Sequence, residues 1–339
     1  MRRPVITSKR LNDLLEIASA SRVLVIGDVM LDQFVYGKVG RISPEAPVPV
    51  VEFERETLMP GGAANVARNL RALGAHAELL SVVGSDDSAA TLRRLLDEQE
   101  IVCDGLVVEP DRLTSIKTRI IAHHQQVVRL DRETRHELTP QITKKLLQTF
   151  EQKLGAADAV IACDYGKGVL SQGLLDAMKR LCRERGIWLS LDPKPVHHLD
   201  LTGLSLITPN RKEAFELAGQ HDNRCGANPL EDAGLMRVAD QLLNQLRPAL
   251  LLITLGEQGM LLCKRGQKPF HVPTVAQEVF DVSGAGDTVI ASFTLTVTAG
   301  ASPIEAALFS NHAAGVVVGK MGTAVVTPAD IVASFRRKS

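Results

Sequence analysis

The chain contains the segment Asp281-Val282-Ser283-Gly284-Ala285-Gly286-Asp287, directly before a helical run at residues 288–299. Glycines just before a helix let backbone N–H groups converge on an anion, and the helix dipole adds positive potential there. A carboxylate beside a bound anion would repel it, so Asp287 makes chemical sense as a base that takes a proton from an attacking hydroxyl. The alternative is a helix N-terminal aspartate stabilised by the dipole, and the turn alone favours neither.

Outward from this turn, the chain alternates between strand-like and helical segments. Apolar runs typical of strands buried on both faces occur at residues 23–26, 77–83, 159–162, 187–191, 204–207 and 250–254. Helical patterns separate these runs. The alternation predicts an α/β fold, with a doubly wound, mostly parallel sheet flanked by helices.

Two regions depart from this alternation and read as β-rich segments outside the main sheet. They are residues 33–56 and 113–131. We expect them to form a small lid, with residues 1–32, 57–112 and 132–339 forming the α/β domain.

Composition excludes several classes of function. Lys+Arg and Asp+Glu number 39 each, which argues against nucleic acid or a membrane surface as the main partner. The five cysteines contain no C-x-x-C pair, so neither a disulfide framework nor a zinc site is expected. No signal peptide or membrane-spanning run is evident, and we expect a cytoplasmic protein.

Two further turns carry ligand-binding residue types. Paired glycines in Pro60-Gly61-Gly62-Ala63-Ala64-Asn65 allow close backbone approach to a ligand, although a tight loop with Asn65 packed locally is slightly favoured on these residues alone. Asp28 and Asp32 follow the first strand, where ligands of open α/β sheets bind, and carboxylates suit sugar hydroxyls. No dinucleotide fingerprint follows this strand and no P-loop occurs, which disfavours a nicotinamide-dependent oxidoreductase and a P-loop enzyme.

Taken together, three motifs resemble those of the ribokinase-like (PfkB) carbohydrate kinases. Gly61-Gly62 with Asn65 and the 281–287 turn stand about 220 residues apart, with Asn210-Arg211-Lys212-Glu213 between them. The order and spacing agree from about residue 11 to residue 335. The resemblance implies an ATP-dependent sugar kinase that uses Mg²⁺, and it leaves a monovalent-cation requirement open.

Other segments narrow the resemblance to family members that act on D-glycero-β-D-manno-heptose 7-phosphate. These segments are residues 27–32, Gly40-Arg41-Ile42-Ser43-Pro44-Glu45-Ala46-Pro47-Val48-Pro49-Val50, Asp164-Tyr165-Gly166-Lys167-Gly168 and Asp192-Pro193-Lys194. The implied product is heptose 1,7-bisphosphate, for ADP-heptose and lipopolysaccharide inner-core synthesis. Such kinases are often fused to a nucleotidyltransferase, but no His-x-Gly-His element is present, so we expect the kinase activity alone. Another ribokinase-like sugar or nucleoside kinase, or a non-catalytic sugar-binding sensor, remains the alternative.

The resemblance also implies residue roles for catalysis and ATP binding. Asp287 would be the general base, and the backbone of Gly284, Ala285 and Gly286 would stabilise the transferring phosphoryl group. Asn210 and Glu213 would organise Mg²⁺ and the phosphates, and Glu213 would act through one of the several waters that Mg²⁺ keeps. The implied ATP-binding set is Asn210, Glu213, Thr254, Gly256, Gly259 and Asn311. A core-facing polar residue is an equal alternative for Asn311.

Sugar hydroxyls are assigned by the same resemblance to Asp28, Asp32, Gly61, Gly62 and Asn65. A sugar phosphate also needs cations, and Lys117 and Arg119 lie two apart in an expected strand, so they share one face. Arg129 lies on the returning strand, and we expect the three to hold the phosphate, with a solvated strand face as the alternative. Further candidates are Lys167 and Lys194.

The expected hairpin between residues 113 and 131 has His123 and His124 at its tip, where we expect solvent exposure. The lid would also leave strand edges open, and pairing between the lids of two subunits would cover them. We therefore expect a homodimer.

Overall fold

The computed structural model describes residues 6–123, 125–195, 198–223, 228–276 and 278–336. Its larger sheet has nine strands: β1 (Arg22–Gly27), β4 (His76–Val83), β5 (Val102–Val108), β8 (Ala159–Cys163), β9 (Trp188–Asp192), β10 (Leu206–Ile207), β11 (Leu250–Thr254), β12 (Met260–Cys263) and β13 (Phe270–Val272). Their spatial order is β13-β12-β11-β10-β9-β8-β1-β4-β5, and all pairs are parallel except β11–β12 and β12–β13. The predicted doubly wound α/β sheet is confirmed.

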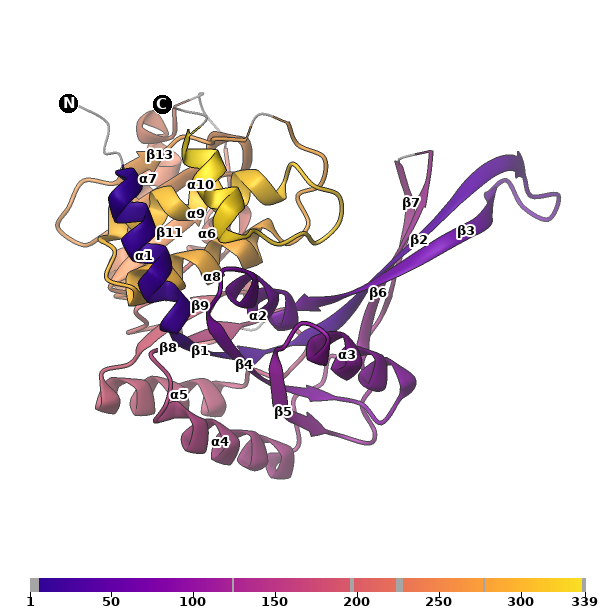
Figure 1. The fold of residues 1–339 in the computed structure, drawn as a ribbon, viewed down its shortest axis with the longest axis horizontal. Helices are drawn as coiled ribbons and strands as arrows, with labels where there is room; N and C mark the ends of the chain where they lie inside the picture. Colours follow the sequence, from indigo (N-terminus) through magenta and orange to yellow (C-terminus); the bar gives the residue numbers. More distant parts are fainter. Residues whose placement is uncertain (1–5, 124, 196–197, 224–227, 277, 337–339) are drawn as a thin grey trace.

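Helices cover both faces of this sheet (Figure 1). One face packs against α1 (Ser8–Ala20), α2 (Ala63–Ala72), α3 (Asp87–Asp97), α8 (Ala285–Thr298), α9 (Pro303–Val317) and α10 (Pro328–Arg336). The other packs against α4 (Pro140–Leu154), α5 (Gln172–Arg185), α6 (Arg211–Leu217) and α7 (Ala233–Gln245). Two short 3₁₀ turns lie at Pro229–Glu231 and Gly256–Gln258.

Strand β1 shows why the sheet is buried on both faces. Val23 and Val25 point into the first core, whereas Leu24 and Ile26 point into the second. Successive side chains of a strand alternate between faces, so a continuous apolar run fills both layers at once. β1 is therefore buried on both faces, and it lies between β8 and β4 in the sheet.

A second sheet projects away from the helical layers (Figure 1). It consists of β2 (Val29–Ile42), β3 (Pro49–Gly62), β6 (Ser115–Ala122) and β7 (Gln125–Arg132), in the order β3-β2-β6-β7. β2 pairs antiparallel with β3 and parallel with β6, and β6 pairs antiparallel with β7. The β2–β3 ladder runs from Val29 opposite Gly62 to Ile42 opposite Pro49, so these strands reach further toward the large sheet than the 33–56 boundaries that we expected.

The base of the second sheet meets the carboxyl edge of the large one. β2 begins two residues after β1 ends, and β3 runs directly into α2. The turn before α8 approaches the same place, because a Cβ atom on Gly284 would lie 2.6 Å from Asn65 Nδ2 in α2. No helix in the described part of the chain is long and apolar enough to cross a membrane.

Candidate active site

Asp287 lies in the first turn of α8, where Gly284 is the N-cap. Gly284 has a φ of +79°, a left-handed conformation that favours glycine. A side chain there would also collide with Asn65. The glycine therefore serves both the turn and the close packing of α8 against α2.

Two side chains donate hydrogen bonds to the Asp287 carboxylate. Asn65 Nδ2 donates to Oδ2 at 2.7 Å, and the Tyr165 hydroxyl donates to Oδ1. Burial raises the pKa of Asp287 to about 6, while the hydrogen bonds from Tyr165 and Asn65 act to lower it. A carboxylate with this pKa is ionised at neutral pH and can still accept a proton.

Arg68 supports Asn65 from one turn further along α2. Its Nη1 donates to Asn65 Oδ1 at 3.1 Å and to the Thr323 carbonyl at 3.0 Å. Burial lowers the pKa of Arg68, and the charges of Asp32 and Asp287 oppose that effect. Arg68 thus supplies a positive charge near the carboxylates, a role that we did not predict, although it stands three residues after the predicted Asn65.

The glycines of the 60–65 turn leave space for atoms of Asp28 and Asp32, which a side chain would displace. A Cβ atom on Gly61 would lie 2.1 Å from Asp32 Oδ2, and one on Gly62 would lie 2.5 Å from the Asp28 carbonyl oxygen. Gly62 also has a φ of +62°. These positions let β3 pass close to the two aspartates before the chain enters α2.

Asp28 organises the loop after β8. Its carboxylate accepts backbone N–H groups from Tyr165 at 2.8 Å, Lys167 at 3.1 Å and Val169 at 3.0 Å. The residue is only 1% exposed. The expectation that Asp28 holds a sugar hydroxyl is therefore not supported, because its carboxylate is committed to the backbone.

Asp32 and the basic residues share one face of the second sheet. Asp32 lies opposite Lys117, and Arg119 lies opposite Arg129. Arg119 Nη1 donates to Asp32 Oδ1 at 2.5 Å, and its guanidinium carbon lies 5.1 Å from the Phe34 ring centroid. Arg119 is thus held in place before any ligand arrives.

The other cations differ in their partners. Arg129 is half exposed and pairs with Asp131 at 2.9 Å. Lys167 is buried and forms an ion pair with Glu133. Lys117 finds no carboxylate within ion-pairing distance among the described residues, and burial lowers its pKa. Since burial penalises the charged form, a bound anion would stabilise the Lys117 ammonium.

The Asn210–Glu213 segment starts α6 as a capping box. Asn210 Oδ1 accepts from the Glu213 N–H at 3.0 Å, and Glu213 Oε2 accepts from the Asn210 N–H at 3.0 Å. Lys194 Nζ contacts Glu213 Oε1 at 3.0 Å. Lys194 therefore lies beside the segment expected to serve Mg²⁺, and its contact with the sugar phosphate stays a prediction.

Asp192, to which we had assigned no role, places a further carboxyl group near Glu213. Burial, the charge of Glu213 and the charge of Asp287 raise its pKa well above the usual range. Thr208 donates to its Oδ1 at 3.2 Å. The excess of carboxylates at this edge suits a cation.

The predicted nucleotide residues lie around the β11–β12 turn and α9. Thr254 forms a parallel β-bridge with Asn210. Gly259 allows the backbone to pass close to Val272, because a Cβ atom at this position would lie 2.0 Å from the Val272 carbonyl oxygen. Asn311 is buried on α9 and donates to the Pro273 carbonyl at 2.9 Å. A cavity of about 430 Å³ opens beside this helix, lined by Val275, Glu278, Phe280, Gly315, Gly319 and Lys320 among others.

The turn before α8 offers fewer free donors than we expected. The Ala285 N–H donates to the Val282 carbonyl at 3.2 Å, so it is engaged within the turn. Asp281 shapes the turn by accepting from the Ser283 N–H at 2.9 Å and the Gly322 N–H at 3.2 Å. Gly286 is exposed in the first turn of α8, where helical N–H groups have no intrahelical acceptor.

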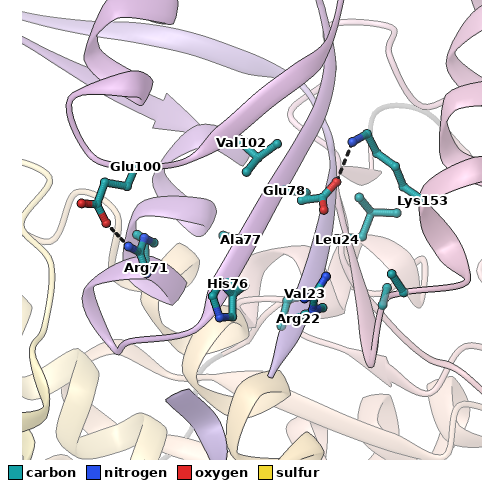
Figure 2. A pocket seen from close by; sticks show the side chains of 12 residues that line it. Arg22, Val23, Leu24, Arg71, His76, Ala77, Glu78, Glu100, Val102 and Lys153 are labelled. Atoms are coloured by element: carbon teal, nitrogen blue, oxygen red, sulfur yellow. Dashed lines mark hydrogen bonds and ion pairs between the residues drawn. The ribbon is translucent and has the colours of Figure 1, made fainter. Parts of the chain in front are cut away.

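A separate cavity of about 200 Å³ opens at the opposite edge of the large sheet, where the strands begin (Figure 2). Two ion pairs flank it, Arg71 with Glu100 and Lys153 with Glu78, the latter at 2.8 Å. Ligands of open α/β sheets bind at the carboxyl edge instead. The candidate active site is therefore at Asp287 and not in this cavity.

Solved structures define the class of fold. An Arabidopsis thaliana ribokinase complexed with ribose and ATP superposes with a TM-score of 0.72 at 17% identity, covering 94% of this chain and 99% of that one. Phosphofructokinase-2 from Escherichia coli in complex with potassium gives a TM-score of 0.76 at 18% identity, with the same coverage. The fold is ribokinase-like.

Sequence comparison places the chain more narrowly. The model of the pfkB family of carbohydrate kinases matches residues 20–330, and the chain belongs to this family. It is 43% identical to the bifunctional protein HldE of Citrifermentans bemidjiense over 96% of its length, and 48% identical to that of Caulobacter vibrioides over 92%. The chain spans 65% and 62% of the length of these two relatives.

Proposed function

We propose that the chain phosphorylates D-glycero-β-D-manno-heptose 7-phosphate at its anomeric hydroxyl, with ATP as the donor. The observation that carries the proposal is the buried Asp287 carboxylate, held by Asn65 and Tyr165 beside a helix N-terminus. The heptose-kinase-like segments and the HldE relatives support the choice of sugar. The product would be heptose 1,7-bisphosphate, the precursor type expected for ADP-heptose and the lipopolysaccharide inner core.

The proposed reaction needs one base and one site of charge stabilisation. Asp287 takes the proton of the anomeric O–H group as that oxygen forms a bond to the γ-phosphorus. The bond from phosphorus to the bridging oxygen breaks, and ADP leaves. Charge on the transferring group is stabilised by N–H groups at the start of α8, with Gly284 and Gly286 as the remaining candidates.

We infer that Lys117 and Arg119 hold the 7-phosphate. They lie on the same face of the second sheet as Asp32. We propose that Asp32 contacts the sugar hydroxyls. A phosphate would pair with Lys117, which forms no ion pair with another described residue, and would compete with Asp32 for Arg119. Arg129, already paired and half exposed, is the outermost member of this set.

Magnesium fits the carboxylate edge through water. Within the described residues, no three His, Cys, Asp or Glu side chains gather closely enough to hold a metal ion directly. Mg²⁺ usually keeps several waters and binds one or two carboxylates plus substrate phosphates. Glu213 with Asn210 would hold such an ion, close to the carboxyl group of Asp192, whose pKa is raised by burial and by the charge of Glu213. The ion would offset charge on the phosphates during transfer.

The ATP base would occupy the cavity beside α9. Its walls come from the segment before α8, from the end of α9 and from α10, and Asn311 fixes the backbone at Pro273 nearby. Thr254 ends β11 and forms a β-bridge with Asn210, and Gly256 begins the turn that follows. The structure of Escherichia coli phosphofructokinase-2 is a complex with potassium, but we propose no potassium site for this chain.

We also infer that the second sheet acts as a lid and joins two subunits. On the face away from Asp32, Val35 lies opposite Ile120, which lies opposite Val128. Val128 is 49% exposed and Leu130 is 65% exposed. An exposed apolar patch on a sheet with open edges favours association with a second copy.

A substrate comparison tests the proposed function. ADP release would be measured with heptose 7-phosphate, unphosphorylated heptose, ribose and fructose 6-phosphate, with a reaction lacking sugar as the control. We expect the highest kcat/KM with heptose 7-phosphate. A higher kcat/KM with another sugar would reassign the substrate, and no sugar-dependent ADP release would contradict the kinase proposal.

A further inference from the structure

Tyr165 occupies a position that the assignment of sugar and nucleotide sites leaves unused. It lies in the loop after β8, and its hydroxyl donates to Asp287 Oδ1 while Asn65 donates to Oδ2. Each oxygen of the carboxylate therefore has its own donor. Two donors from separate elements restrict rotation of a carboxylate more than one donor can.

The loop that carries Tyr165 is itself held firmly. The Tyr165 N–H donates to Asp28 Oδ2 at 2.8 Å, and the Gly166 N–H donates to Asp164 Oδ1 at 2.9 Å. A Cβ atom on Gly62 would lie 3.4 Å from Tyr165 Cε2, so the ring lies close to that glycine. The buried Asp28 therefore fixes the backbone of Tyr165, from which the phenol hydroxyl reaches Asp287.

We propose that Tyr165 is a positioning residue for Asp287, holding the carboxylate in the orientation that accepts the proton of the sugar hydroxyl. The inference rests on the proposed function, in which Asp287 is the base. Because the phenol donates to the carboxylate, it also favours the ionised, catalytically competent form.

The electrostatic consequence has a definite sign. Burial raises the pKa of Asp287, and the hydrogen bond from Tyr165 lowers it. Removing the phenol leaves burial less opposed, so the pKa of Asp287 rises and the base becomes protonated at a higher pH. The other titratable and charged groups that act on Asp287 or respond to its charge are Asp32, Arg68, Lys117, Cys163 and Asp192.

The test is the pH dependence of kcat for Tyr165→Phe against the wild type. We expect the acid limb to move up by about one pH unit and kcat below that limb to fall about tenfold or more, because one hydrogen bond to a charged group is lost. Much of kcat should return at higher pH, and KM for both substrates should stay within about twofold. The matched control is Tyr36→Phe, at the chain's only other tyrosine, which should behave as the wild type. An unmoved acid limb in Tyr165→Phe would overturn the inference.

Asp287→Asn separates this inference from the proposed function. If Asp287→Asn turns over normally, Asp287 is not the base and the proposed function fails. If it is inactive while Tyr165→Phe keeps the wild-type profile, only the role of Tyr165 fails.

A second measurement does not depend on activity. In a Tyr36→Phe background, Tyr165 is the only tyrosine, and its ionisation can be followed by tyrosinate absorbance. Burial and the charge of Asp287 raise the pKa of Tyr165 well above its usual range. Adding Asp287→Asn should lower that pKa. An unchanged titration would show that the contact is absent in solution, and this readout serves even where Tyr165→Phe does not fold.

Discussion

At the residue scale, the site depends on the Asp287 carboxylate, whose ionised form is disfavoured by burial. Asp287 is buried, and its ionised form is retained by donors from Asn65 and Tyr165. Arg68 adds a positive charge nearby. A base of this kind combines a pKa near neutrality with a fixed direction.

The raised pKa of Asp287 predicts a pH-dependent cost to stability. The ordinary value is 3.8 and the folded value is about 6, so the folded state binds this proton more tightly than the unfolded state. The contribution of this group to the free energy of unfolding therefore falls, by up to about 3 kcal/mol, as pH rises from about 4 to about 6. Asp287→Asn cannot titrate, so its stability relative to the wild type should increase across this window. Denaturant unfolding at several pH values measures the difference, and a pH-independent difference would contradict the shift.

Gly284 predicts a backbone effect on catalysis. Gly284→Ala should cost about 1–2 kcal/mol of stability for its left-handed φ, and the new methyl group should also displace Asn65 and lower kcat. Gly186→Ala is the matched control, since Gly186 has a φ of +67° but nothing within 4 Å of its added Cβ. Thermal unfolding and turnover are the measurements. Equal turnover in the two variants would show that the contact with Asn65 does not matter.

At the element scale, the sheet edges bring distant segments together. The turn before α8, the start of α2 and the loop after β8 all meet at the carboxyl edge, and β6 brings Lys117 close enough to act on Asp287. The second sheet carries Lys117 and Arg119 together with Asp32, whereas Asp287 comes from the first turn of α8.

The second sheet predicts a selective effect on sugar binding. Arg119→Ala should raise KM for the phosphosugar about 10- to 100-fold, because a charge-assisted contact to phosphate is lost, while KM for ATP stays unchanged. Arg94→Ala removes an exposed arginine of α3 that pairs with Glu98 and should change neither constant. Steady-state kinetics with each substrate varied decide the matter. A raised KM for ATP alone would place Arg119 on the nucleotide side.

Much of the fold was predictable because apolar runs and helical spacing are local signals. The parallel strands at 23–26, 159–162 and 250–254 were found, whereas β12 and β13 were not, since they are short and antiparallel. Lys117 and Arg119 were placed on one face by strand alternation alone. The commitment of Asp28 to backbone N–H groups and the contact of Tyr165 with Asp287 were not predictable, because each joins segments more than 120 residues apart.

At the scale of the whole molecule, equal totals of charge conceal a separation. The 39 basic and 39 acidic residues cancel, yet the site places Lys117 and Arg119 on the second sheet and Asp192 and Glu213 at the edge of the large one. Under the proposed function, these separate surfaces of a neutral chain would receive the two anionic substrates.

The projecting sheet predicts the oligomeric state. The wild type should sediment with twice the mass of the 36.7 kDa chain, and Leu130→Glu should shift it toward the single-chain mass by placing a charge in the apolar patch. Val102→Glu, at an equally apolar but separate exposed position, is the control and should leave the mass unchanged. A wild type that sediments as a single chain at micromolar concentration would contradict the homodimer.

The central claim is that Asp287 is the base of a sugar kinase, and turnover of Asp287→Asn with heptose 7-phosphate and ATP tests it most directly. A single base contributes roughly 10²- to 10⁴-fold, so kcat should fall by about that factor while KM for the phosphosugar changes little. Near-normal turnover in a folded Asp287→Asn variant would contradict the account.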